Sequence, residues 1–333
     1  MTDIPLITTI ITTYRRPLLL TRAVRSVLNQ TYPNFQLCVY DNASNDETQQ
    51  IMEEFTKSDS RVKYHRHPEN LGMMGNYQYS FSEVTTPYFS FLSDDDLVLP
   101  WFYETALKGF EQHLDIVFSA CSVVILDKEG GVIDVPLSRW RKEGYIEPQE
   151  AMGHMPGSFP VPNGVPFHSR VLKKTVIDRT YVALWDCDFL LRTAMREPIY
   201  LSKKTCALFL HHENSFSAQQ AFETVRKDMC LLINKFTDTQ AHQPLTEWLK
   251  KTTLGFVSYQ IRKKNYRDAY RLASSYIKTH GFNLKSAIFV LIAKTSQYLP
   301  VDRCVFVLLQ YTRRWFVKKH QLREEYGEFA QWL

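Results

Sequence analysis

The sequence predicts an α/β fold: a Rossmann-like, mostly parallel sheet flanked by helices, with a helical C-terminal extension. Apolar runs of strand length alternate with segments of helical periodicity over the first hundred residues. This alternation is typical of parallel strands joined by right-handed crossovers. Polar clusters follow several of the runs. Beyond about residue 219, Gly and Pro become rare, and helical periodicity with Lys/Arg clusters dominates.

The first predicted strand, Leu6 to Thr13, is a continuous β-branched run, which indicates burial on both faces. Arg16-Pro17 ends it, and apolar residues at helical spacing follow. The alternation then predicts helix 18–30, strand 35–40, helix 46–56, strand 62–65, helix 74–84 and strand 88–92. After Pro100 the pattern loosens into helices at 101–112 and 185–196, a strand or strand pair at 116–126, and a Pro/Gly-rich loop at 156–166.

Composition sets broad limits on the class of protein. The 333 residues are 44% hydrophobic and 23% charged, which is ordinary for a folded domain. Six scattered cysteines lack the spacing of zinc or redox pairs, so we expect reduced, mostly buried thiols in a cytoplasmic protein. Met1 to Pro5 lacks a basic n-region and no apolar run approaches membrane length, so we expect neither a secretory signal nor a membrane span.

Three adjacent carboxylates, Asp94-Asp95-Asp96, come directly after the predicted strand 88–92. Buried carboxylates are costly unless a cation offsets them, and no basic residue stands beside them in the sequence. Hard cations such as Mg²⁺ or Mn²⁺ prefer oxygen ligands and keep positions open for phosphates. Thr12, Asp41 and the Asn70 loop follow other strands, and all these strand ends are expected at one edge of the sheet. The pattern therefore predicts a metal–nucleotide site there.

Five patches, in this order, resemble the inverting family 2 glycosyltransferases with the GT-A fold. They are Ile11-Thr12-Thr13-Tyr14-Arg15-Arg16-Pro17 with the segment to Pro33, Asp41-Asn42-Ala43-Ser44, Asn70-Leu71-Gly72-Met73-Met74-Gly75-Asn76, Ser93-Asp94-Asp95-Asp96, and Trp185 to Arg192 with Phe209 to Ser215 downstream. Any one patch alone would be a weak signal, whereas their order and spacing over two-thirds of the chain are specific.

The resemblance implies roles for individual residues. Asp94 corresponds to the residue that meets the ribose, Asp95 to the metal ligand, and His212 to a histidine that contacts the metal or the diphosphate. Asp186 occupies the position of the catalytic base. From the residues themselves, Asp41 could accept a hydrogen bond from the N3–H of uracil or thymine, and Tyr14 could stack on the base. The predicted donor-binding set is Thr12, Tyr14, Arg16, Asp41, Asn70, Gly72, Asn76 and Asp94.

The sequence departs from the family pattern at two places. Trp185 stands where many members have an acid, and it could instead form a platform for a sugar. Phe209-Leu210-His211-His212 lacks the arginine of the corresponding family motif. Structural alternatives also stay open: Asp41-Asn42 as an Asx turn, Asn70 to Gly72 as a simple turn, Asp186 as a helix N-cap and His212 as a structural histidine.

We interpret residues 1–218 as a GT-A domain, with a nucleotide-binding half (1–100) and an acceptor half (101–218), and residues 219–333 as a helical region. The implied enzyme is a hexosyltransferase that uses Mn²⁺ or Mg²⁺ to move a sugar from a UDP- or dTDP-sugar to a glycan or lipid-linked acceptor in bacterial polysaccharide biosynthesis. Cations at 313, 314, 318 and 319, beside Trp315 and Phe316, indicate either a solvated helical face or attachment to an anionic membrane surface.

Two other functional classes compete with this hypothesis. A sugar nucleotidyltransferase should carry a Gly-rich, Arg-containing loop after the first strand, but no glycine precedes Gly72. A basic adaptor or nucleic-acid-binding protein is compatible with the net charge of +5, but the acidic cluster argues against a nucleic acid as partner. The expected location is cytoplasmic, with a peripheral position on the inner face of the cell membrane as the alternative.

Overall fold

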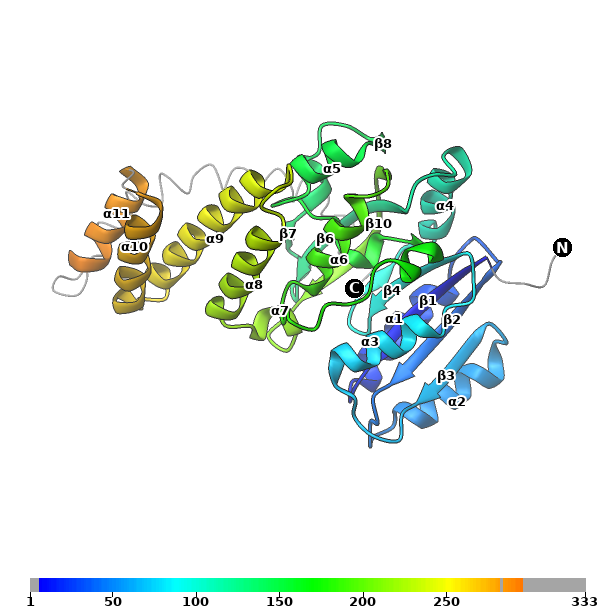
Figure 1. Ribbon diagram of the computed structural model, residues 1–333. Helices are drawn as coiled ribbons and strands as arrows, with labels where there is room; N and C mark the ends of the chain where they lie inside the picture. The colour runs from blue at the N-terminus through cyan, green and yellow to red at the C-terminus, as the bar shows by residue number, and fades with distance from the viewer. Residues whose placement is uncertain (1–5, 282–283, 296–333) are drawn as a thin grey trace. The chain divides into compact units, whose positions relative to one another are not determined.

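The computed structural model describes residues 6–281 and 284–295 (Figure 1). The described residues form two compact units, one that extends to Gln219 and one that begins at Gln220. The first unit contains every predicted site residue. The division of this unit into a nucleotide-binding half and an acceptor half remains a functional prediction.

A mixed sheet forms the centre of the first unit, in the strand order β3-β2-β1-β4-β9-β6-β10-β5. The long strands pair in parallel: β1 with β2 and β4, β2 with β3, and β6 with β10. The short strands pair antiparallel. The bounds are β1 Ile7–Thr13, β2 Phe35–Asp41, β3 Val62–Arg66, β4 Tyr88–Ser93, β5 Leu97–Val98, β6 Phe118–Asp127, β7 Val132–Asp134, β8 Gly144–Ile146, β9 Phe167–His168 and β10 Ile199–His211. The predicted α/β class is confirmed.

Helices cover both faces of the sheet. Their bounds are α1 Pro17–Leu28, α2 Thr48–Ser58, α3 Gly72–Ser82, α4 Phe102–Gln112, α5 Pro148–His154, α6 Trp185–Ala194 and α7 Phe216–Gln219. Short 3₁₀ turns occupy Pro136–Arg139, Pro162–Gly164 and Ser169–Lys173. Pro17 starts α1 because its fixed φ suits the first helical position and its missing N–H is not needed there.

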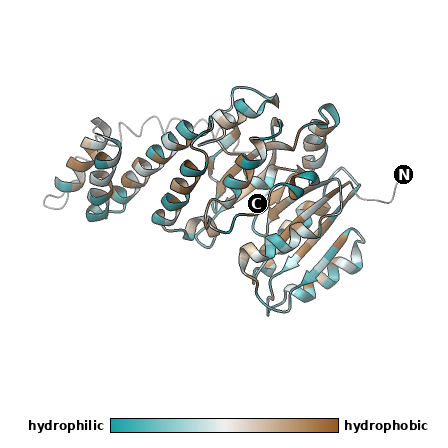
Figure 2. Ribbon diagram, in the orientation of Figure 1, coloured by the Kyte–Doolittle hydropathy of each residue, from teal (hydrophilic) through white to brown (hydrophobic). Residues whose placement is uncertain are grey.

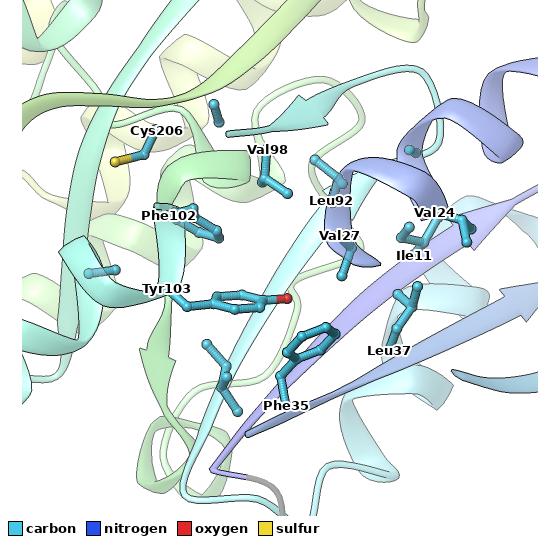
Figure 3. Packing of buried hydrophobic residues seen from close by; sticks show 14 of the residues in the cluster. Ile11, Val24, Val27, Phe35, Leu37, Leu92, Val98, Phe102, Tyr103 and Cys206 are labelled. Atoms are coloured by element: carbon cyan, nitrogen blue, oxygen red, sulfur yellow. The ribbon is translucent and has the colours of Figure 1, made fainter. Parts of the chain in front are cut away.

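One face of the sheet packs against α1 and α4 (Figure 3). Val24 and Val27 of α1 lie over Ile11 and Leu37, while the ring of Tyr103 lies 5.2 Å from that of Phe35. Figure 2 shows brown, hydrophobic residues along the central strands and a mixture of brown and teal along the helices. Most residues of β1, β4 and β6 are buried. Burial on both faces of the sheet explains why these strands appear in the sequence as continuous apolar runs.

Aromatic rings fill the opposite face, under α3 and α6. Phe89 and Phe91 alternate along β4 with Ser90 and Leu92, which point to the α1 side. The ring of Phe167 lies 5.3 Å from that of Phe89 and 5.5 Å from that of Phe189 in α6. This aromatic layer supports the start of α6, where the candidate catalytic base lies.

The described part of the second unit consists of helices, as the sequence predicts for the C-terminal region. They are α8 Phe222–Lys235, α9 His242–Arg262, α10 Tyr266–His280 and α11 Leu284–Thr295. Leu254 and Val257 of α9 pack with Ala269 and Ala273 of α10. Of the helices that the structure describes, none combines the length and apolarity needed to cross a membrane. The basic and aromatic residues at 313–319, for which the sequence suggested membrane attachment, lie outside the described residues.

Candidate active site

A cavity of about 490 Å³ opens at the carboxyl ends of β1 and β4. Its walls come from the turns after β2 and β3, the turn Pro162–Gly164, the start of α6 and the segment after β10. The volume lies within the range of small-molecule sites. It brings together most of the predicted residues, which are Thr12, Tyr14, Arg16, Asn70, Gly72, Asn76, Asp94, Asp95 and Asp186.

Two interlocked turns form one wall of the cavity. The backbone N–H of Asn42 donates to the carbonyl of Thr13 (2.9 Å), and the N–H of Arg15 donates to the hydroxyl of Ser44 (2.8 Å). Arg15 and Ala43 have φ angles of 56° and 62°, and such left-handed backbone costs about 1–3 kcal/mol for a non-glycine residue. The cross-links between the turns hold this backbone in place and fix the position of the cavity wall.

Asp41 ends β2 and is buried behind the cavity. Its side chain has no exposed surface, and it is not part of the cavity wall. One oxygen accepts from the N–H of Ser44 (2.8 Å) and the other from the hydroxyl of Tyr64 (2.7 Å). Both oxygens therefore have partners within the chain, Ser44 in the turn and Tyr64 in β3. The contact with the N3–H of a base stays a prediction, and it would require Asp41 to exchange one of these partners. The Asx-turn alternative describes Asp41 better.

Asn42 and Asn70 hold the loop after β3 against the turn after β2. The side-chain oxygen of Asn42 accepts from the N–H of Leu71 (2.7 Å), and its NH₂ donates to the side-chain oxygen of Asn70 (2.9 Å). That oxygen also accepts from the N–H of Gly72 (2.8 Å), whose φ of 72° favours glycine. Sequence analysis identified Asn70 and Gly72 as site residues but not Asn42, which lines the cavity with them.

Tyr14 and Asn76 line the cavity in different ways. Tyr14 is 39% exposed, and the guanidinium of Arg15 lies 5.0 Å from the centre of its ring. The ring is therefore available for stacking. Asn76 is only 2% exposed; its oxygen pairs with His67 (3.0 Å) and its NH₂ donates to the carbonyl of Tyr40 (2.9 Å). Asn76 thus supports the wall more than it offers a polar group to a ligand.

The three aspartates after β4 have three different environments. Asp94 accepts from the hydroxyl of Thr13 (2.8 Å) and from Arg16 (3.2 Å). One oxygen of Asp95 lies 2.9 Å from Nη1 of Arg16. Asp96 is fully enclosed and accepts from the N–H of Leu210 (2.7 Å). Burial raises the pKa of Asp94 to about 6, against the opposing charge of Arg16.

Asp96 ties together three parts of the site. Besides the N–H of Leu210 in β10, it accepts from the NH₂ of Asn163 in the turn Pro162–Gly164. Burial and then the neighbouring charge of Asp95 raise the pKa of Asp96. Asp96 therefore holds the loop in place and does not line the cavity. Asn163, which sequence reasoning missed, lines the cavity itself.

His212 lies beside Asp95, and His211 does not. Nε2 of His212 is 3.1 Å from the Asp95 oxygen that Arg16 also contacts, whereas His211 is exposed at the end of β10. Among residues 6–281 and 284–295, no three or more His, Cys, Asp or Glu side chains could hold a metal ion together. The Asp95–His212 pair nevertheless suits a cation that takes its other ligands from a diphosphate and water, which is common for Mg²⁺.

Asp186 lies at the start of α6, and its side chain reaches the cavity. One of its oxygens accepts from the N–H of Cys187 (2.8 Å). Burial raises the pKa of Asp186 to about 6, which is closer to neutral pH than the pKa of an ordinary aspartate. Asp188, the next acid in the helix, is fully buried, is bonded to Arg192 (2.7 Å) and does not line the cavity.

Aromatic rings adjoin Asp186. Trp185 lines the cavity at 7% exposure, with its ring 4.9 Å from Tyr77 and 5.7 Å from Phe91. Phe209 and Phe216 complete this apolar side. Apart from Trp185, sequence reasoning missed these rings as site residues. Their periodicity on β4, α3 and β10 is that of core residues, and only the folded chain shows that they border a cavity.

The chain resembles known proteins in sequence and in fold. Residues 8–164 match the family model described as Glycosyl transferase family 2. The chain is 22% identical over 305 residues to a GalNAc(5)-diNAcBac-PP-undecaprenol beta-1,3-glucosyltransferase of Campylobacter jejuni, a match that covers 91% of this chain and 87% of that protein.

Two solved structures show the same fold. One is S. aureus TarS 1–349 in complex with UDP-GlcNAc, with a TM-score of 0.59, 17% identity and 87% coverage of each chain. The other is a mannosyltransferase of Pyrobaculum calidifontis in complex with GDP-Man and Mn²⁺, with a TM-score of 0.55 and 14% identity, covering 97% of this chain and 88% of that one.

Proposed function

The chain is a family 2 glycosyltransferase with the GT-A fold, and from this premise we propose that it catalyses metal-dependent, inverting transfer of one sugar from a UDP- or dTDP-sugar. The observation that carries the proposal is a single cavity that contains Asp94, Asp95 and Asp186 on opposing elements. Family membership favours an enzyme of this class over a nucleotidyltransferase or a basic adaptor. We place the reaction in bacterial polysaccharide biosynthesis, with a glycan or lipid-linked acceptor.

The donor would bind along the carboxyl ends of β1 and β4. Tyr14 offers a ring face to the base, and Asn42 and Asn70 form the polar wall beside it. Asp94 would receive the ribose hydroxyls, and Arg16 has N–H groups that suit a diphosphate. The TarS complex contains a UDP-sugar, which supports UDP as the carrier.

Asp95 and His212 would hold Mn²⁺ or Mg²⁺, which would supply charge neutralisation for the departing diphosphate. Asp96 keeps the loop in place through Leu210 and Asn163. The cavity walls of Trp185, Tyr77 and Phe91 exclude water on the side of the transferred sugar. Exclusion of water protects the donor from hydrolysis.

Asp186 would act as the general base. It removes the proton of the acceptor hydroxyl while that oxygen bonds to C1 of the donor sugar. The bond between C1 and the diphosphate oxygen breaks on the opposite side, so the configuration at C1 inverts. A pKa of about 6 keeps the carboxylate ionised at neutral pH and still makes it a stronger base than an exposed aspartate.

A named relative and the sequence itself indicate the acceptor and the cellular location. The Campylobacter relative is named for transfer to a glycan on undecaprenol-PP, which favours a lipid-linked acceptor. We place the enzyme in the cytoplasm, with a peripheral attachment to an anionic membrane surface through the basic residues at 313–319. Those residues lie outside the described part of the chain, so this attachment rests on the sequence.

The test of this function is Asp95→Ala, assayed with UDP and dTDP with and without Mn²⁺. Thermal shift should show Mn²⁺-dependent nucleotide stabilisation in the wild type and none in the variant, because a metal ligand is lost. Asp59→Ala removes a carboxylate that pairs with Arg61 (2.7 Å) away from the cavity and is the matched control. An Asp95→Ala enzyme that binds and turns over like the wild type would overturn the metal assignment.

A further inference from the structure

Arg16 already neutralises the carboxylates that the sequence suggested had no protein cation. Its Nη1 lies 2.9 Å from Asp95 and 3.2 Å from Asp94. Its Nη2 donates to the backbone carbonyl of Asn214 (2.7 Å), in the segment after β10. The guanidinium therefore joins both aspartates to the segment that contains His212.

The position of Arg16 is set by the backbone around it. Arg16 directly precedes α1, whose first residue is Pro17, and follows Arg15 with its φ of 56°. The N–H of Arg15 is held by the hydroxyl of Ser44 (2.8 Å). Burial alone would lower the pKa of Arg16, but the charges of the two aspartates outweigh it and raise the pKa. Arg16 is thus a permanently charged partner of the two aspartates.

A metal ion and Arg16 would compete for the same oxygen of Asp95. That oxygen has two lone pairs and lies within hydrogen-bond distance of both Arg16 Nη1 (2.9 Å) and His212 Nε2 (3.1 Å). Nδ1 of His212 accepts from the N–H of Asn214 (3.2 Å), so in the neutral ring the proton lies on Nε2 and faces Asp95. A cation that binds both this oxygen and Nε2 of His212 must displace at least one of these contacts.

We propose that Arg16 is an internal counter-ion, which occupies Asp94 and Asp95 in the nucleotide-free enzyme and moves to the diphosphate when metal and donor enter together. The proposal rests on the function proposed above. A diphosphate offers the guanidinium a bidentate partner of the same charge sign as the carboxylates. The metal then takes the place of Arg16 at Asp95, and each ligand favours the binding of the other.

Such an exchange makes the affinities for metal and nucleotide interdependent. Coupling between two ligands is reciprocal, so UDP should raise the affinity for Mn²⁺ by the same factor as Mn²⁺ raises that for UDP. Without Arg16, Mn²⁺ meets only the contact from His212 at this oxygen and loses most of its dependence on the nucleotide. The exchange also breaks the bond from Arg16 to Asn214, which frees the segment after β10.

The test measures Mn²⁺ binding from the electron paramagnetic resonance signal of free Mn²⁺, in full-length protein with and without UDP. We expect Arg16→Gln to bind Mn²⁺ without nucleotide roughly tenfold more tightly than the wild type, within the usual range of coupling factors. UDP should then raise this affinity much less than in the wild type. Arg25→Gln, which changes an exposed arginine of α1 that does not line the cavity, should behave like the wild type.

The outcomes separate this inference from the proposed function. If Asp95→Asn removes Mn²⁺ binding in the presence of UDP but Arg16→Gln leaves nucleotide-free binding unchanged, the counter-ion role is wrong and the metal site stands. If Asp95→Asn changes nothing, both fail. Arg16→Lys keeps the charge but cannot reach both aspartates and Asn214 together, so it should give an intermediate affinity. It also provides the test if Arg16→Gln does not fold.

Discussion

Asp186→Asn should lower kcat steeply and stabilise the fold at the same time. The pKa of this aspartate rises from 3.8 to about 6 because the folded chain buries it. A shift of one pKa unit corresponds to about 1.4 kcal/mol, so the ionised side chain opposes folding by up to about 3 kcal/mol. Since the cavity admits some solvent, we expect a gain of about 1–3 kcal/mol in the free energy of unfolding. Asn still offers an oxygen to the N–H of Cys187.

The size of this stabilisation depends on pH. Below about pH 4 the carboxyl is protonated in both folded and unfolded chains, so wild type and variant should be equally stable. The wild type loses stability as the pH rises from about 4 to about 6, because only the unfolded chain releases the proton readily. Above the folded pKa of about 6, the full difference should persist.

The catalytic rate of Asp186→Asn should fall although its stability rises. Loss of a general base typically lowers kcat by roughly 10²–10⁴-fold. In the wild type, kcat/KM should rise with pH through about 6 as Asp186 ionises, and this rise should be absent in the variant. Donor affinity should stay unchanged because Asn keeps the shape of the side chain.

The assay combines urea unfolding at acidic and mildly alkaline pH with initial rates of sugar transfer. Asp188→Asn is the matched control, because Asp188 is buried in the same helix but is bonded to Arg192. Loss of that buried partner should destabilise the fold by about 3–5 kcal/mol. An Asp186→Asn enzyme with wild-type kcat, or with lower stability than the wild type at alkaline pH, would refute the reasoning.

Three further predictions concern other parts of the chain. Asn42→Ala should weaken UDP binding about tenfold in calorimetry, because two hydrogen bonds that hold the Asn70 loop are lost; unchanged affinity would make this loop irrelevant to the donor. Trp185→Leu should lower kcat/KM about tenfold, with Trp185→Phe less affected, since an aromatic face contributes about 0.5–1.5 kcal/mol; equal rates would exclude a platform role. Reversal of the cations at 313, 314, 318 and 319 to Glu should abolish salt-sensitive co-sedimentation with anionic vesicles, at about 1 kcal/mol per charge; binding indifferent to salt and reversal would argue against membrane attachment.

The strands β1, β2, β4 and β6 were predictable because each is a run of mostly apolar, buried residues. The long strand β10 was not predicted, because Ser202 to Thr205 interrupt its apolar run with polar residues. The location of the site was also predictable, because parallel strands place their carboxyl ends at one edge of the sheet. The short strands β5 and β9, of two residues each, carry no periodicity. Their pairing is set by contacts far along the chain.

The roles of individual polar residues were less predictable. An aspartate that holds a turn and one that contacts a nucleotide base have the same sequence context. The burial of Asp41, which favours the turn, is visible only in the folded chain. The cation beside Asp95 lies 79 positions away in sequence. His212 could be distinguished from His211 only by which side chain points inward at the end of β10.

The two residues of β9 also affect how the chain can fold during synthesis. β9 lies between β4 and β6 and pairs with both, so the edge of β4 stays uncovered until Phe167 has been made. At about 5–20 residues per second, the interval between Ser93 and Phe167 lasts roughly 4–15 s. For that time a nascent chain exposes a long apolar strand edge, which is a template for aggregation. Fast expression should therefore lower the soluble yield of this protein, and substitutions that weaken β9 should act mainly on that yield.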